Sequence, residues 1–71
     1  MWLAKAERGK KVTIVSMSTD HVLAERLAAL GLFPGAQVEV IRNSHKGEVI
    51  LACLDSRFAL GRELTNSIEV V

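Results

Sequence analysis

The sequence predicts a mainly β protein, a small and partly open β-barrel of about five strands with one α-helix inserted after the first strand. Three observations favour this class. Short segments of alternating apolar and polar residues are separated by tight-turn residues. One segment instead has apolar residues at helical spacing and ends at a glycine. The 71 residues leave room for a single domain, 1–71, with a small core.

Composition and charge argue against several classes of protein. The chain is 49% hydrophobic and 24% charged, which is too apolar for a disordered segment. Its net charge of +1 gives no general attraction to nucleic acid or to an anionic membrane. No run of apolar residues approaches the roughly 18 that a membrane span needs, and no secretory signal is recognisable. With one cysteine, we expect a cytoplasmic protein without direct membrane insertion.

The N-terminal part is predicted to form a lid and the first strand. Trp2 and Leu3 are interpreted as an apolar lid over one end of the barrel, with a frayed terminus as the alternative. Residues 11–17 alternate as a strand, with Val12 and Ile14 on one face. Because the far end of this strand is apolar on both faces, we expect the following helix to cover it.

Residues 18–30 are predicted to form an amphipathic helix. Its apolar stripe consists of residues at i, i+4 and i+7, namely Leu23, Leu27 and Leu30. Ser18 is the expected N-cap, because its hydroxyl can accept a hydrogen bond from a free backbone amide of the first turn. Met17 and Val22 would then form a hydrophobic staple across the start of the helix.

The end of the helix and the following turn are predicted from glycine and proline. Gly31 suits the left-handed position after a helix, where Leu32 can fold back onto Leu27 in a Schellman motif. Pro34 and Gly35 suit the second and third positions of a type II turn. The chain should therefore leave the helix in a fixed direction and enter the next strand.

The remaining four strands are expected at residues 37–42, 48–54, 57–60 and 68–71. In the first of these, alternation places Val38 and Val40 on the inner face. Both faces of the second are apolar, so we interpret it as the central strand. Phe58 and Leu60 should point inward, and residues 61–67 should change direction through a single helical turn.

Several motifs together form a recognisable pattern. The most specific is R-L-x-x-L-G-L-x-P-G at residues 26–35. The others are Leu3, Gly9, the alternating Val38-Glu39-Val40, the run Phe58-Ala59-Leu60-Gly61-Arg62-Glu63-Leu64 and the final Ile68-Glu69-Val70. In these residues almost the whole chain resembles the FeoA family, ferrous iron transport protein A. One departure is Gly61, where members of the family often carry a larger residue.

The resemblance implies an SH3-like β-barrel with the helix between its first two strands. It also implies a cytoplasmic accessory protein of bacterial ferrous iron uptake that acts with the membrane GTPase FeoB. The same module is similar to the C-terminal domain of iron-dependent repressors of the diphtheria-toxin-repressor type. Because no helix-turn-helix precedes it in this chain, a repressor would need a missing DNA-binding domain.

The sequence contains no motif for catalysis or for a cofactor. Neither of the glycine-rich phosphate-binding patterns, G-x-x-x-x-G-K-[ST] and G-x-G-x-x-G, is present. We therefore expect no catalytic residues, no bound cofactor and no enzyme activity, and we assign GTP chemistry to the partner. Cys53 should be a small buried hydrophobe. Arg8, Lys10 and Lys11 should form a solvated turn, because three aromatic residues give no stacking platform for nucleic acid.

His21 and Glu25 are weak candidates for metal binding. Their i, i+4 spacing on the predicted helix would let them share a metal ion. His45 is expected in a loop and Cys53 in a core strand, so neither should join them. Two ligands are fewer than protein metal sites use. We expect the two side chains to form a weak, solvent-exposed ion pair, with no metal site.

The outward side of the predicted helix is a candidate docking surface. Small side chains there would let another backbone approach closely, although alanine is also simply the best helix former. The expected partner-binding residues are Val22, Ala24, Arg26, Ala28 and Ala29, with Leu32 and Phe33 at the helix exit. Our leading hypothesis is a non-enzymatic interaction module that docks on FeoB. The alternative is a metal-sensing or nucleic-acid-binding barrel related to the repressor domains.

Overall fold

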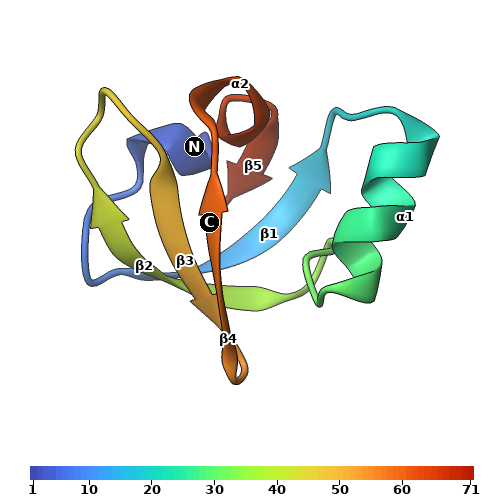
Figure 1. Cartoon of the computed structure of the whole chain (residues 1–71), viewed down its shortest axis with the longest axis horizontal. Coiled ribbons are helices and arrows are strands. Elements are labelled where there is room, and N and C mark those ends of the chain that lie inside the picture. Colours follow the sequence, from blue (N-terminus) through green and yellow to red (C-terminus); the bar gives the residue numbers. More distant parts are fainter.

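Five antiparallel strands form one curved sheet in the order β4-β3-β2-β1-β5 (Figure 1). The computed structural model describes all 71 residues. The strands are β1 (Lys11–Met17), β2 (Gln37–Asn43), β3 (Val49–Cys53), β4 (Ser56–Leu60) and β5 (Ile68–Val70). The helical elements are the 3-10 turn η1 (Leu3–Lys5), the inserted helix α1 (His21–Ala29) and the single turn α2 (Arg62–Thr65). The predicted mainly β class, with its helix after the first strand, is confirmed.

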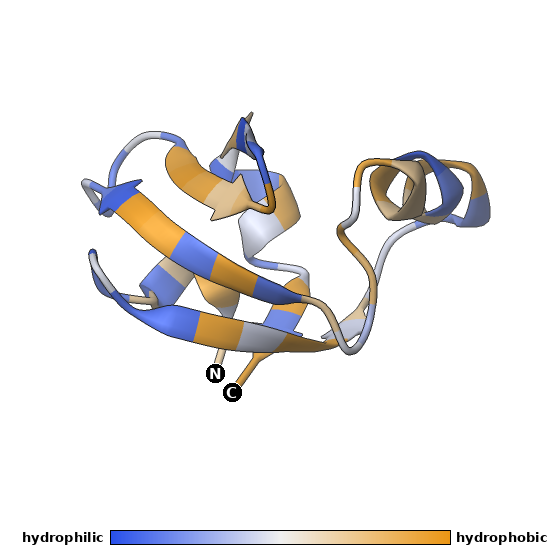
Figure 2. Ribbon diagram, turned by 90° about the horizontal axis from the view of Figure 1, so that it is seen from below, coloured by the Kyte–Doolittle hydropathy of each residue, from blue (hydrophilic) through white to orange (hydrophobic).

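The inner face of the sheet holds the core. Its buried residues alternate along the strands as predicted, and Figure 2 shows this alternation as bands of colour. They include Val12 and Ile14 of β1, Val38 and Val40 of β2, Val49, Leu51 and Cys53 of β3, Leu60 of β4, and Ile68 and Val70 of β5. Phe58 is half-buried against this cluster. The single helical turn expected within residues 61–67 is α2.

The interpretation of β3 as the central strand is wrong. β2 occupies the middle of the sheet, and β3 lies between β2 and β4. The outer face of β3 is only partly covered at Ile50 and Ala52, and Leu54 lies beyond the strand in the turn to β4. A barrel of this size has no second layer over its outer face, so apolar residues on that face remain partly exposed.

The N-terminus is fixed to the last strand. The amino group of Met1 donates a hydrogen bond to the Val70 carbonyl at 2.9 Å, and the Val70 amide donates to the Met1 carbonyl at 2.7 Å. Trp2 forms a bridge with Glu69. Leu3 is fully buried, whereas Trp2 lies at the surface. The predicted lid is therefore formed by Leu3, and a frayed terminus is excluded.

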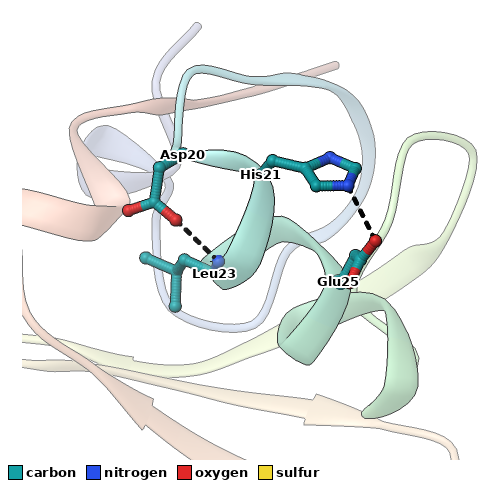
Figure 3. Close-up of polar contacts among 4 residues, drawn as sticks. All are labelled: Asp20, His21, Leu23 and Glu25. Carbon is teal, nitrogen blue, oxygen red and sulfur yellow. Dashed lines mark hydrogen bonds and ion pairs between the residues drawn. The ribbon is translucent and has the colours of Figure 1, made fainter.

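The predicted start of α1 is wrong by two residues. Asp20 is the N-cap, and its Oδ1 accepts a hydrogen bond from the Leu23 amide at 2.8 Å (Figure 3). Ser18 instead extends the pairing of β1, because its amide donates to the Ser67 carbonyl at 2.8 Å. The staple between Met17 and Val22 does not form: Met17 pairs with β5, and Val22 is exposed. Ser18 does not cap the helix because its backbone pairs with the sheet. Asp20 is the cap instead, and aspartate is as favourable as serine at this position.

The predicted end of α1 is confirmed. Gly31 has φ +96°, its amide donates to the Ala28 carbonyl at 3.0 Å, and the Leu32 amide donates to the Leu27 carbonyl at 2.9 Å. These two hydrogen bonds define the Schellman motif. The inward position predicted for Leu30 is wrong, since it is 52% exposed. Leu30 is the C-cap, and α1 lies to one side of the barrel (Figure 2), so only a narrow face of the helix is covered.

The predicted type II turn is confirmed and is hydrogen-bonded to β1. The Ala36 amide donates to the Phe33 carbonyl at 2.9 Å, and Gly35 has φ +98°. Ile14 then pairs with both sides of the turn: its amide donates to the Ala36 carbonyl at 2.9 Å, and its carbonyl accepts from the Gly35 amide at 2.7 Å. The segment between β1 and β2, which carries α1, therefore rejoins the sheet beside Ile14 of β1.

Arg62 and Asn43 form a polar network that joins three parts of the barrel. The Arg62 guanidinium donates to the Gly47 carbonyl at 2.7 Å, to the Ala4 carbonyl at 2.8 Å and to Oδ1 of Asn43. The Asn43 amide donates to the carbonyls of Ala4 at 2.9 Å and Ala6 at 2.8 Å. This Arg62 network connects η1, the β2–β3 loop and α2, so it closes the end of the barrel that Leu3 fills.

We expect Arg62→Lys to lower the free energy of unfolding by about 1–3 kcal/mol, because one ammonium group cannot reach all three acceptors. Urea unfolding followed by circular dichroism measures the change. Arg8→Lys, in an exposed turn, is the matched control and should unfold like the parent protein. Equal stability of the two variants would show that the network contributes nothing.

Gly31→Ala should lower the free energy of unfolding by about 1–2 kcal/mol, because φ is positive there. A Cβ atom would also lie 3.4 Å from Sγ of Cys53. Gly61→Ala is the matched control: φ is −68°, and nothing lies within 4 Å of a built Cβ. The control should change stability by less than about 0.5 kcal/mol. Thermal unfolding of both variants tests whether the positive φ at Gly31 determines the stability of the protein.

Candidate functional site

A shallow apolar groove of about 300 Å³ lies between α1 and the turn that follows it. We call it the α1 groove and define it by Met17, Ala24, Ala28, Leu32, Phe33 and Pro34. The two alanines come from one face of α1, and Phe33 and Pro34 come from the type II turn. Because the Schellman motif and the hydrogen bonds to Ile14 hold the two walls, the groove is preformed.

The structure divides the predicted docking residues into two groups. Ala24, Ala28 and Phe33 line the α1 groove, and Phe33 is 45% exposed. Leu32 lies beneath them as the floor and is 1% exposed, so the expectation that it belongs to the open surface is wrong. Its side chain turns inward because the Schellman motif folds it back against the core.

Val22, Arg26 and Ala29 form the second group. They are exposed and follow one another at i, i+4 and i+7, so they share a different side of α1 from the groove. The predicted residues therefore do not make one continuous surface. The sequence pattern placed Leu23 and Leu27 correctly on the covered side of the helix, but it did not show which uncovered side would meet the turn.

His21 and Glu25 stand at the edge of the α1 groove. Nε2 of His21 lies 2.8 Å from Oε1 of Glu25, and both side chains are largely exposed (Figure 3). The predicted exposed pair is confirmed. No group of three or more histidine, cysteine, aspartate or glutamate side chains comes together anywhere in the chain. His45 lies in the β2–β3 loop, and Cys53 is buried with Sγ 3.5 Å from the Gly31 carbonyl.

A larger and more polar hollow, about 440 Å³, lies between the start of α1 and α2. Two of its polar side chains are paired within the chain. The Asp20 carboxylate caps α1, and the Ser67 hydroxyl donates to the Leu64 carbonyl at 2.6 Å. Oγ1 of Thr19 is buried there without a hydrogen-bond partner. Sequence reasoning did not single out this hollow, and its residues do not form a recognisable binding set.

Comparison with known proteins supports one family. The family model for the FeoA domain matches residues 1–71. A crystal structure of an iron uptake regulatory protein (FeoA) is similar, with a TM-score of 0.88 and 28% identity over 99% of this chain and 93% of that chain. The solution structure of the FeoA protein from Chlorobium tepidum has a TM-score of 0.87 and 25% identity, over 99% of this chain and 68% of that one. No curated protein matches the chain.

A manganese-dependent transcriptional repressor shares the fold. Its TM-score is 0.86 with 20% identity, and the match covers all of this chain and 40% of the repressor chain. At this identity the likeness concerns the fold alone. None of the helices in the present structure is both long enough and apolar enough to cross a membrane.

We expect Glu25→Gln to change the free energy of unfolding by less than about 0.5 kcal/mol, because both partners of the pair are exposed to water. Leu27→Ala on the same helix is the control for sensitivity, and it should cost about 2–4 kcal/mol because Leu27 is buried. Urea unfolding of both variants tests this difference. A loss at Glu25 comparable with that at Leu27 would mean that the pair is a structural element of the groove.

Proposed function

This chain belongs to the FeoA family, and on that premise we propose that it is a cytoplasmic accessory protein of bacterial ferrous iron uptake. We propose that it has no enzyme activity of its own and docks on the cytoplasmic side of a FeoB-type membrane GTPase. The family match along all 71 residues supports the role in iron uptake. One similar structure is of a protein described as an iron uptake regulatory protein.

The observation that carries the docking proposal is the exposed apolar surface of the α1 groove. Ala24 and Ala28 lie one helical turn apart, so a partner backbone can approach α1 closely between them. The half-exposed ring of Phe33 offers apolar area that a partner can cover. An apolar centre with polar groups at its edge, here His21 and Glu25, is the usual anatomy of a protein interface.

The way α1 is attached also favours docking. Its two ends are fixed by the Asp20 cap and the Schellman motif, while most of its surface remains free of the barrel. A partner would therefore meet a helix face and a turn whose positions are already set. A preformed surface loses little conformational entropy on binding, which favours even a small interface.

The double variant Ala24→Glu with Ala28→Glu should weaken binding to the membrane GTPase at least tenfold, because two carboxylates would be buried against the partner. Binding is measured by surface plasmon resonance with the detergent-solubilised GTPase. Circular dichroism and thermal unfolding of the variant confirm that it is folded.

The matched control is Val22→Glu with Ala29→Glu, which adds the same charge to the other exposed side of α1. It should bind like the parent protein. Unchanged binding by the folded groove variant would reject the α1 groove as the docking surface. Loss of binding only in the control would assign docking to the side of Val22, Arg26 and Ala29.

A further inference from the structure

The sheet has one edge without a partner. β4 and β5 are its outer strands. β5 is already covered on its outer side, because Met1 exchanges two hydrogen bonds with Val70. β4 pairs only with β3 (Figure 1). It has no proline and no bulge, which commonly protect an edge strand, and Arg57 is its only charged residue. The β4 edge is therefore open to another strand.

The alternation of hydrogen bonds shows which backbone groups of β4 are free. Cys53 pairs with Ser56 across a two-residue turn, and residues that flank such a turn exchange hydrogen bonds. Because the pattern alternates, the amide and carbonyl groups of Arg57 and Ala59 point away from β3. No hydrogen bond from another part of the chain reaches either residue, and both are exposed. Two donors and two acceptors at this spacing match the backbone of an extended peptide.

The inner side of the β4 edge is apolar. Leu23 and Leu64, which line the hollow between α1 and α2, are half-buried against the core, and so is Phe58. Residues that an added strand places opposite Phe58 and Leu60 would share their inward-facing side. An added strand therefore needs an apolar side chain at every second position.

The hollow between α1 and α2 lies at the end of the β4 edge, because Gly61 follows β4 and lines it. Taken alone, its residues form no recognisable binding set. Its charged residues are both acidic, Asp20 and Glu63, and neither has an ion-pair partner. The Arg62 guanidinium is held in the Arg62 network, and Arg57 is four residues, roughly 13 Å, from Gly61 along the strand. The hollow therefore favours a positively charged group.

We propose that an extended segment of another protein adds to the β4 edge as an antiparallel sixth strand, with the pattern basic-x-apolar-x-apolar. Its apolar residues lie opposite Leu60 and Phe58, and its basic residue precedes them beside the hollow. The residues between exchange hydrogen bonds with Arg57 and Ala59, so backbone pairing supplies affinity and the side chains supply specificity. In this chain the only strand with this pattern, at residues 10–14, is already paired within the sheet.

This contact goes beyond the proposed docking on a membrane GTPase, because it uses a different surface from the α1 groove. Nuclear magnetic resonance titration of the isotopically labelled protein with acetyl-Lys-Thr-Val-Thr-Val-Thr-amide tests it. With few hydrogen bonds, the dissociation constant should be on the order of 0.1–1 mM. The largest chemical-shift changes should be at the amides of Arg57 and Ala59.

Ala59→Pro removes only an outward-facing amide, so it should weaken peptide binding at least tenfold while leaving the sheet paired. Circular dichroism confirms that this variant is folded. Ala59→Thr is the matched control, because it keeps the amide, and it should bind like the parent. Glu63→Gln should weaken binding about threefold, because an exposed charge pair contributes little.

Two modified peptides test the pairing without any change to the protein. N-methylation of the last two threonines, which lie opposite Ala59 and Arg57, should abolish binding. N-methylation of the two valines, whose amides point away from β4, should leave it unchanged. Absence of binding by the unmodified peptide would overturn the proposal. So would equal binding by the two methylated peptides, or parent-like binding by folded Ala59→Pro. That variant should still bind the membrane GTPase, since the α1 groove is intact.

Discussion

The position of α1 depends on the backbone pairing of Ile14 with the Pro34–Gly35 turn. The insertion between β1 and β2 leaves the sheet after Ser18 and returns to it beside Ile14 through hydrogen bonds of 2.7 and 2.9 Å. Within α1 only Leu27 is fully buried, so side-chain packing alone gives the helix little hold on the barrel. The α1 groove exists because the chain is fixed at this crossing and because the Schellman motif sets the direction in which the helix ends.

The sequence predicted those parts of the fold that are determined by local chemistry. Gly31, Pro34 and Gly35 each require a particular backbone conformation, and the structure has it in the predicted place. Ser18 was the predicted cap, but its backbone pairs with the sheet, and the helix starts at Asp20 instead. Such a choice depends on tertiary contacts that a local pattern does not contain.

The candidate site could be predicted only in part, again because tertiary contacts are not contained in a local pattern. Helical spacing identified Leu23 and Leu27 as the covered side, but the exposure of Leu30 depends on how far the helix stands from the barrel. The division of the docking residues into two sides depends on where Phe33 lies after the turn. The Arg62 network joins residues far apart in the sequence, and no spacing rule connects them.

The manner in which α1 is attached also implies a hierarchy of motions. The barrel is held by five paired strands and a shared core, whereas α1 is held at its two ends, by buried Leu27 and by half-buried Leu23. Amide protons of α1 should therefore exchange with solvent through local opening, while those of β2 and β3 wait for global unfolding. The sulfur of Cys53 lies 3.5 Å from the Gly31 carbonyl just after α1, so an opening that extends to Gly31 would release this contact, and the rate at which the buried thiol is alkylated should follow that opening.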